Sequence, residues 1–213
     1  FIPTKSSLGS DIIEKWGFDK EFRGSDARIS PQKLIVMKNP FNLSADERVV
    51  LLPAINPDVS IIHVQKVDTQ GNVRIEGLTF ADVELAKAAR HLIVTCEEVV
   101  ENTALRSDPQ LNQLPSFFVD AIVKAPKGAH PTQCYNYYDI DIEFLYSLID
   151  ASRSDDTLSE FLREYIFGVT DYEEYLGKLG SKIFHKISAD PCLGYRANLE
   201  RRRNVTNQRD NNF

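Results

Sequence analysis

Four polar side chains in the middle of the chain could line a catalytic or binding cleft: His63, Gln65, Glu97 and His130. An imidazole can carry a proton near neutral pH, and a carboxylate can act as a base or a nucleophile. These residue types therefore suit general acid–base chemistry. The imidazoles and the carboxylate are far apart in the sequence, so only the fold could bring them together.

His63 and Gln65 belong to a β-prone stretch, 59–67, in which they alternate with the apolar residues Ile62 and Val64. Successive side chains of a strand point to opposite faces, so one face of this strand is partly polar and the other is apolar. A buried polar group without a partner costs roughly 1–3 kcal/mol, so both side chains need hydrogen bonds. The pattern favours a structural or interface imidazole, and a cleft-lining imidazole is the alternative.

Glu97 follows an apolar stretch, 91–96, and is followed directly by Glu98. Adjacent carboxylates of an extended chain point to opposite sides, so they form no catalytic pair by themselves. An exposed acidic loop is the simpler interpretation, and a carboxylate lining a cleft at the end of the strand is the alternative. His130 lies in a stretch of turn residues, 128–135, whose composition is typical of a loop without a function.

The N-terminal segment 4–11 offers a different kind of site, one for an anion. Lys5, Ser6, Ser7 and Gly9 precede a predicted short helix, 10–16. An ammonium, hydroxyls and the N–H groups at a helix start can together hold a carboxylate or phosphate. The alternative is a capped turn with Lys5 in solvent. Gly-Lys-Ser/Thr is absent, so the segment is not a phosphate loop.

Several complete catalytic or metal-binding motifs are missing from the sequence. The three cysteines are widely spaced, no Cys-x-x-Cys pair occurs, and no His–Cys pairing has the spacing of metal ligands. There is no Gly-x-Ser-x-Gly elbow. We therefore expect no metal and no cofactor, and the sequence contains no self-contained catalytic set.

Composition is typical of a globular protein with a sizeable core. The 213 residues are 42% hydrophobic and 26% charged, with a net charge of −6 and a sequence pI of about 5.3. The acidic balance argues against general nucleic-acid binding. No apolar run approaches the length of a membrane span, and an odd number of cysteines suits a reducing compartment, so we expect a cytoplasmic protein without membrane contact.

Strand and helix patterns alternate along the chain, which predicts an α/β fold. Predicted strands cover 33–38, 48–53, 59–67, 73–75, 91–96 and 117–125, and the turn 68–72 with Gly71 is typical of a tight hairpin. A helix is predicted over 81–90, and 141–187 has helical periodicity throughout. We expect one domain over 1–196 and a disordered tail over 197–213.

Five blocks of sequence, in order and spread over nearly the whole chain, resemble the alpha-type subunits of family I coenzyme A transferases, in the glutaconate CoA-transferase branch. The blocks are FIPTKSSLGSDI, DVSIIHVQKVDTQGNVRIEG, HLIVTCEEVV, VDAIVKAPKGAHPTQCY and DYEEYLGKLG. Close relatives in this family are decarboxylases and hydrolases of CoA esters.

The resemblance implies an open CoA-transferase-type sheet with flanking helices and a helical C-terminal third. It also implies a hetero-oligomer of two alpha and two beta subunits. The activity would move CoA from an acyl-CoA, such as acetyl-CoA, to a dicarboxylic acid such as glutaconate, as in glutamate fermentation. The nucleophilic glutamate of the family belongs to the beta subunit, so the resemblance places no catalytic residue in this chain.

The glycine-rich N-terminal strand and loop of the family pattern is absent from these residues, so we expect an N-terminally incomplete domain. Lys5, Ser6, Ser7 and Gly9 are the preferred substrate-binding candidates, because a distal carboxylate needs a cation or N–H donors.

Two functions are alternatives to CoA transfer. One is the alpha subunit of a CoA-thioester hydrolase or decarboxylase, and the other is a non-catalytic interaction module.

Overall fold

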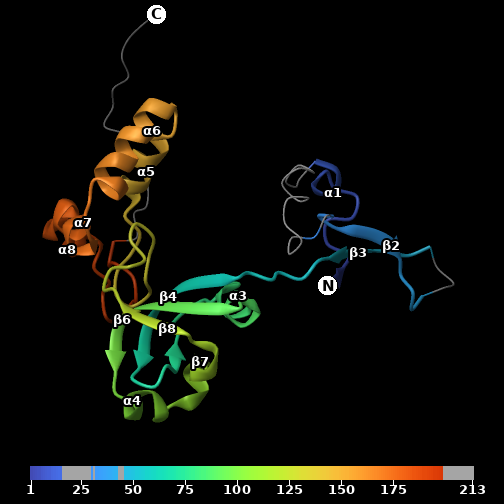
Figure 1. Ribbon diagram of the computed structural model, residues 1–213, viewed down its shortest axis with the longest axis horizontal. Coiled ribbons are helices and arrows are strands. Elements are labelled where there is room, and N and C mark those ends of the chain that lie inside the picture. The colour runs from blue at the N-terminus through green and yellow to red at the C-terminus, as the bar shows by residue number, and fades with distance from the viewer. Residues whose placement is uncertain (16–29, 31, 43–45, 199–213) are drawn as a thin grey trace, which may run out of the picture. The chain divides into compact units, whose positions relative to one another are not determined.

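The computed structural model describes residues 1–15, 30, 32–42 and 46–198 (Figure 1). Their contacts divide the chain into two compact units. The first comprises residues 1–60 and 84–91, and the second comprises residues 61–83 and 92–213. The single domain expected over 1–196 stays a prediction.

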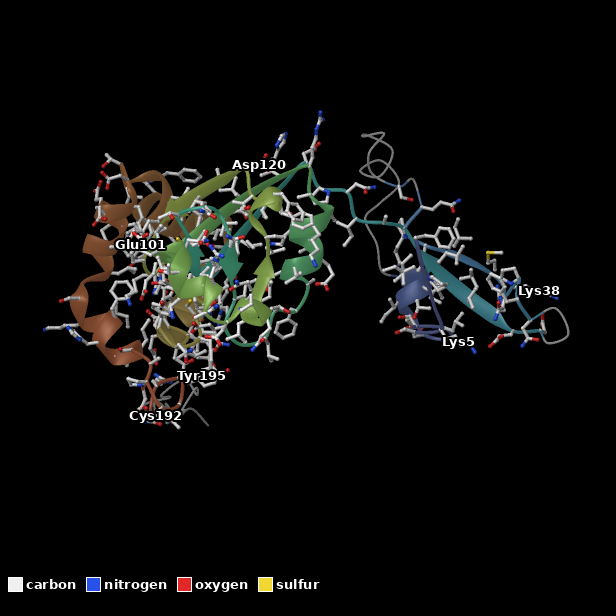
Figure 2. The ribbon with its side chains drawn as sticks, turned by 90° about the horizontal axis from the view of Figure 1, so that it is seen from below. Lys5, Lys38, Glu101, Asp120, Cys192 and Tyr195 are labelled. Atoms are coloured by element: carbon white, nitrogen blue, oxygen red, sulfur yellow. The ribbon has the colours of Figure 1, made fainter. Side chains whose placement is uncertain are left out.

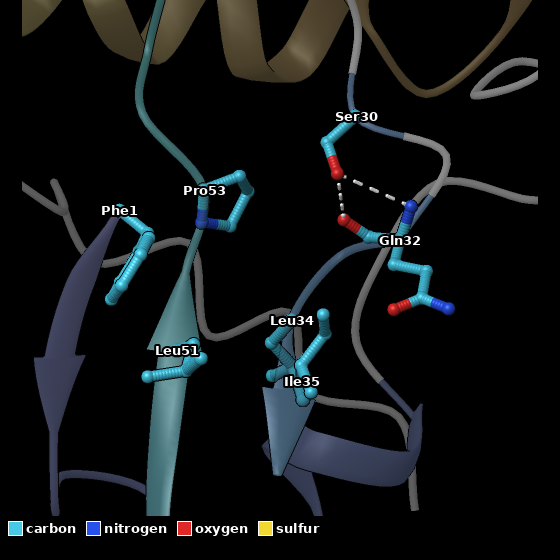
Figure 3. Close-up of a pocket in the computed structure, with 7 residues that line it drawn as sticks. All are labelled: Phe1, Ser30, Gln32, Leu34, Ile35, Leu51 and Pro53. Atoms are coloured by element: carbon cyan, nitrogen blue, oxygen red, sulfur yellow. Dashed lines mark hydrogen bonds between the residues drawn. The ribbon is translucent and has the colours of Figure 1, made fainter. Parts of the chain in front are cut away.

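The first unit contains a three-stranded antiparallel sheet in the order β1 (Ile2–Thr4), β3 (Arg48–Leu52), β2 (Ile35–Lys38). The central strand β3 buries Val49 and Val50, while both edge strands are largely exposed. A pocket of about 250 Å³ at this sheet has apolar walls that include Phe1, Ile35 and Leu51 (Figure 3).

The sequence predictions for the first unit hold where they can be compared. Both predicted strands, 33–38 and 48–53, agree with β2 and β3 within two residues at each end. The predicted helix 10–16 appears as the single turn α1 (Ile12–Lys15), and Trp16 lies outside the described residues.

The second unit is built on a mixed five-stranded sheet in the order β7 (Asn112–Leu114), β5 (Val73–Arg74), β4 (Val59–Asp68), β6 (His91–Val100), β8 (Ala121–Lys124). The pairs β4/β5 and β5/β7 are antiparallel, and β6/β8 is parallel. Apolar side chains from the two central strands form the core, among them Val64, Val67, Leu92 and Val94.

A side-chain anchor fixes the hairpin between β4 and β5. Asp68 accepts hydrogen bonds from the N–H groups of Gln70 (2.9 Å) and Asn72 (2.8 Å), and from the Asn102 amide. Gly71 has a φ of +94°, and a Cβ there would lie 3.3 Å from Ser116 Cβ. The tight hairpin predicted over 68–72 is therefore confirmed, and its turn needs Gly at one position.

The predicted strand 117–125 is wrong in its first half. A turn of 3₁₀-helix, η2 (Ser116–Phe118), precedes β8, because Phe118 N–H donates to Pro115 O and Val119 N–H donates to Ser116 O. The predicted helix 81–90 is α3 (Asp82–Ala88), and the predicted strand 91–96 continues to Val100. Three short elements not predicted are α4 (Asn102–Arg106), η1 (Pro109–Leu111) and the strand β7.

Four helices and a π-helical turn make up the C-terminal part of the second unit (Figure 1). They are α5 (Ile142–Ala151), α6 (Asp155–Leu162), the π turn η3 (Arg163–Phe167), α7 (Tyr172–Leu179) and α8 (Ser181–Ile187). Side chains of Asp141, Ser154 and Asp171 cap α5, α6 and α7 by accepting backbone N–H bonds. The helical character predicted for 141–187 is confirmed.

No helix among the described residues is long and apolar enough to cross a membrane. Most of the predicted disordered tail, 197–213, lies outside the described residues.

Candidate functional site

The centre of the second unit's sheet carries a buried polar cluster. His63 on β4 faces two side chains of β6: its Nδ1 lies 2.8 Å from Thr95 Oγ1, and its Nε2 lies 2.8 Å from Glu97 Oε1. Thr95 Oγ1 also lies 3.2 Å from Ile62 O, so its hydroxyl bridges the imidazole and the backbone of β4. A carboxylate only accepts, so His63 donates from Nε2 to Glu97 in a charge-assisted hydrogen bond.

Glu97 is enclosed by hydrogen-bond donors, and its side chain is only 2% exposed. The Lys127 N–H lies 2.9 Å from both carboxylate oxygens, and Tyr138 donates to Oε1 at 2.9 Å. Burial raises the pKa of Glu97, but the bonds from His63, Lys127 and Tyr138 outweigh burial and leave the pKa below its ordinary value. A carboxylate that is enclosed and fully partnered cannot reach a substrate carbonyl, so Glu97 is not a nucleophile.

A tight loop after β8 brings the Lys127 N–H to Glu97. Lys127 has a φ of +72°, and the loop closes with Gly128 N–H on Ala125 O and His130 N–H on Lys127 O. A Cβ on Gly128 would lie 2.8 Å from both Cε1 and Nδ1 of His63. The loop can therefore approach the imidazole this closely only with glycine at position 128.

Gln65 lies on the same face of β4 as His63 and opens onto a polar pocket. The pocket has a volume of about 160 Å³, and its walls include His63, Gln65, Glu76, Cys134 and Tyr135. The Gln65 amide is fixed, because it accepts from the Glu76 N–H at 2.9 Å and donates to Glu76 O at 3.1 Å. Gln65 therefore shapes the pocket wall rather than offering free hydrogen-bond groups.

Backbone strain gathers around this polar pocket. Three of the four non-glycine residues with positive φ among those described are Phe80 (42°), Lys127 (72°) and Asn136 (70°). Phe80 lines the pocket, Asn136 donates to the wall residue Glu76, and the Lys127 N–H holds Glu97. Each such conformation costs of order 1–3 kcal/mol and is typical of functional sites. This clustering marks the pocket as the best candidate site of the second unit.

Cys134 also lines the pocket, and its thiol has low reactivity there. Burial and the nearby carboxylates of Glu97 and Glu76 raise its pKa to about 12. Reactive cysteines need a stabilised thiolate, so Cys134 is not a nucleophile in this environment.

His130 belongs to a separate network under the C-terminal helices. Its Nδ1 lies 2.7 Å from Tyr175 OH and its Nε2 lies 3.1 Å from Asp141 Oδ2, and its side chain is fully buried. Burial raises the pKa of Asp141, but the bonds from His130 and the Phe144 N–H lower it by more, so the net shift is downward. His130 thus links its loop to α5 and α7 and serves packing.

A second, mostly apolar pocket of about 540 Å³ lies among α5, α6, η3 and α7. Its walls are largely aromatic and include Phe144, Phe161, Tyr165 and Tyr175. Edge-to-face contacts join Phe144 to Phe161 and to Tyr165, with ring centroids 5.4 and 5.0 Å apart.

The predicted anion-binding segment lies in the first unit (Figure 2 labels Lys5). Lys5 forms an ion pair with Glu47, and this bond, together with those from Asn39 and Asn42, lowers the pKa of Glu47 to about 2. Ser7 has a φ of +69° and Gly9 a φ of +77°, while Ser6 donates its N–H to Thr4 Oγ1. The Lys5 ammonium is therefore already paired with the Glu47 carboxylate, and a bound acid would have to compete with Glu47 for Lys5.

Of the residues chosen from the sequence, the fold joins His63 to Glu97 directly and places Gln65 beside them. His130 sits in its own network, and Lys5, Ser6, Ser7 and Gly9 belong to the other unit. Thr95, Lys127 and Tyr138 were missed. Strand parity could have shown Thr95, since it precedes Glu97 by two, but a backbone donor such as Lys127 N–H leaves no mark in the sequence.

The second unit combines an open mixed sheet, a polar cluster on its strands β4 and β6, and helices that follow the sheet in the chain. The protein therefore belongs to the α/β class. The family model of coenzyme A transferases matches residues 11–125, more than half of the chain. The chain therefore belongs to the coenzyme A transferase family.

Individual relatives support the same assignment. The A subunit of glutaconate CoA-transferase from Acidaminococcus fermentans is 39% identical over 199 residues, which cover 93% of this chain and 62% of the relative. The A subunit of 3-oxoadipate CoA-transferase from Pseudomonas knackmussii is 31% identical over 75% of this chain and 55% of the relative.

The crystal structure of glutaconate coenzyme A-transferase from Acidaminococcus fermentans is similar with a TM-score of 0.83 and 40% identity. The match covers 92% of this chain and 61% of that chain. The expected CoA-transferase-type α/β fold is therefore confirmed. This chain spans 55–62% of the length of these relatives.

Proposed function

We propose that the chain is the alpha-type part of a CoA-transferase that moves CoA from an acyl-CoA, such as acetyl-CoA, to a dicarboxylic acid such as glutaconate. The observation that carries this proposal is the 39% identity to the A subunit of glutaconate CoA-transferase over 93% of the chain. A cytoplasmic assembly of two alpha and two beta subunits is part of the proposal.

In the proposed reaction, the beta subunit supplies a glutamate carboxylate that attacks the thioester carbonyl, and CoA leaves as the thiolate. The thiolate then attacks the glutamyl carbonyl of the resulting anhydride, which releases the first acid and forms a glutamyl-CoA thioester. The acceptor acid attacks this thioester and CoA leaves again, which forms a second anhydride. The CoA thiolate then attacks the acceptor acyl carbonyl of that anhydride, which forms the new acyl-CoA and releases the glutamate carboxylate. No external cofactor is needed, because CoA is both substrate and product.

The state of the buried carboxylate supports an external nucleophile. Glu97 is the carboxylate of the polar cluster, and its oxygens are engaged by His63, Tyr138 and a backbone N–H. In the proposed assembly this cluster shapes one wall of the cleft, and the reacting carboxylate comes from the partner chain. Lys5, Ser6, Ser7 and Gly9 remain the proposed contacts of the acceptor acid.

The proposal is tested by purifying the chain with and without a beta-type partner and measuring transfer from acetyl-CoA to glutaconate. We expect turnover only with both chains and both substrates present. Release of free CoA that does not depend on the acceptor acid would instead identify a thioester hydrolase. Stable binding of the partner with no turnover of either kind would leave an interaction module.

A further inference from the structure

Three side chains of types that bind zinc converge beside the polar pocket, and two of them, His63 and Cys134, line it. The potential ligand atoms of His63, Glu97 and Cys134 all lie within 4.8 Å of one another. Spacing along the chain predicts no metal site, because β4, β6 and the segment after β8 each contribute one residue. The fold therefore creates a His–Glu–Cys combination that sequence spacing could not reveal.

The separation of these atoms is close to that of a formed site. Zinc binds nitrogen at about 2.0 Å, carboxylate oxygen at about 2.1 Å and sulfur at about 2.3 Å, so tetrahedral ligand atoms stand roughly 3.5 Å apart. Atoms within 4.8 Å of one another need movements of about 1 Å to reach that geometry. Small side-chain rotations provide such movements.

The outer hydrogen bonds of His63 are those that a metal-binding imidazole requires. Thr95 Oγ1 lies 2.8 Å from His63 Nδ1 and 3.2 Å from Ile62 O, a contact that orients the ring and directs Nε2 toward Glu97. With its own proton on Ile62 O, Thr95 can accept from Nδ1–H once a cation occupies Nε2. A cation between Nε2 and Oε1 would take the place of the proton that they now share. Partners on the second ring nitrogen are a regular feature of zinc sites.

Hydrogen bonds also position the Glu97 carboxylate and the backbone of Cys134. Glu97 accepts from the Lys127 N–H and from Tyr138 OH, so its carboxylate is fixed by donors other than His63. Cys134 exchanges backbone hydrogen bonds with Tyr138, each of 2.9 Å. Tyr138 thus connects two of the three ligands through one residue.

A path for the cation exists on the pocket side. His63 and Cys134 both line the pocket of about 160 Å³, whose other walls include Gln65, Glu76 and Tyr135. Three protein ligands with a fourth position open to such a pocket is the arrangement of a zinc site that can still bind water. A simpler interpretation is a core thiol next to a His–Glu hydrogen bond. This interpretation explains why the three side chains are largely buried, but it does not explain why all three potential ligand atoms converge.

We propose that His63, Glu97 and Cys134 form a binding site for one thiophilic divalent cation, with Zn²⁺ as the preferred ion. His63 binds through Nε2 and keeps a proton on Nδ1 facing Thr95, and Cys134 binds as the thiolate, its thiol proton leaving to solvent through the pocket. No redox step is involved. The proposal is independent of the proposed CoA transfer, because it concerns binding alone.

The test is a titration of the purified full-length protein, together with its partner subunit if the two purify together, with Co²⁺ and then Zn²⁺. We expect one equivalent of Co²⁺ to produce a thiolate-to-cobalt charge-transfer band, which Zn²⁺ then abolishes. Cys134→Ser should remove the band, and Thr95→Val should weaken binding by about 10-fold through the loss of the outer bond. Cys192→Ser, at an exposed cysteine (Figure 2), is the matched control and should change nothing.

Absence of a band in the parent protein, or a band that survives Cys134→Ser, would overturn the proposal. Far-ultraviolet circular dichroism of each variant separates lost binding from lost folding. Should Cys134→Ser unfold, Cys134→Ala combined with a competition assay for Zn²⁺ serves instead, and unchanged affinity there contradicts the site.

Discussion

His63 Nε2 lies 2.8 Å from Glu97 Oε1, although the residues are 34 positions apart in the sequence. The contact joins β4 and β6 of the second unit's sheet at a point where Glu97 is buried and the His63 side chain is 12% exposed. Because Thr95, Lys127 and Tyr138 complete the hydrogen bonds of the pair, it behaves as one polar unit inside an apolar core.

Removal of the charge of Glu97 should destabilise the protein strongly. Glu97→Gln preserves the shape of the side chain but replaces the charged acceptor of the bonds from His63, Lys127 and Tyr138 at a buried position, so we expect a loss of about 2–4 kcal/mol in the free energy of unfolding. Urea denaturation measures this. Glu98→Gln is the control, since Glu98 accepts a bond from Tyr137 at the surface and should cost less than about 1 kcal/mol. Equal losses in the two variants would contradict the account.

The close approach of Gly128 to His63 predicts a sharp difference between two glycines. Gly128→Ala would place a methyl group 2.8 Å from the imidazole and from Ala125 O, so we expect a loss of about 1–3 kcal/mol. Gly177→Ala lies in helix α7, where a Cβ meets no atom within 4 Å, and should be stabilising by about 0.5–1 kcal/mol. Thermal unfolding measures the stability of both variants. An unchanged stability in Gly128→Ala would show that the loop can move away from His63.

Stability should fall in acid through the buried carboxylates. The folded-state pKa values of Glu97 and Asp141 lie below their ordinary values of 4.5 and 3.8. A depressed pKa contributes stability above the unfolded-state value, and this stability is lost as the pH falls through the folded-state value. We therefore expect the free energy of unfolding to decline below about pH 4.5. Asp141→Asn should make the free energy of unfolding fall less steeply with decreasing pH. A pH dependence identical to that of the parent protein would show that Asp141 does not contribute to it.

The proposed role of the N-terminal segment predicts a change in substrate affinity. Lys5→Ala should raise the KM for the acceptor acid by about 10-fold in the assembled enzyme, which corresponds to the loss of one charge-assisted hydrogen bond. Lys38→Ala removes another exposed, paired lysine of the same unit, at 3.0 Å from Asp46, and should leave KM unchanged. An unchanged KM in Lys5→Ala would exclude Lys5 from the site.

Alternation of side chains predicted the central strands well, because buried strands leave a regular pattern in the sequence. It also placed His63 and Gln65 on one face of β4. The pattern could not predict that His63 meets Glu97, because the order of strands in the sheet is a tertiary property.

The remaining parts of the site left even weaker signals. The Lys127 N–H is a backbone group, and its position depends on a positive φ and on Gly128. The stretch 117–120 is predicted as strand, but it forms a 3₁₀ turn and the residues that follow it. Two of its N–H groups donate to the nearby carbonyls of Pro115 and Ser116 instead of to a neighbouring strand. Local apolar character alone does not distinguish these conformations.

The central claim is that this chain forms a wall of the cleft while another chain supplies the covalent carboxylate. The most direct measurement is to incubate the assembled enzyme with acyl-CoA, reduce any enzyme thioester with borohydride, and locate the modified residue by mass spectrometry. The account predicts that the modified glutamate lies in the partner chain and that no carboxylate of this chain is modified. A modified carboxylate in this chain, whether assembled or isolated, would contradict it.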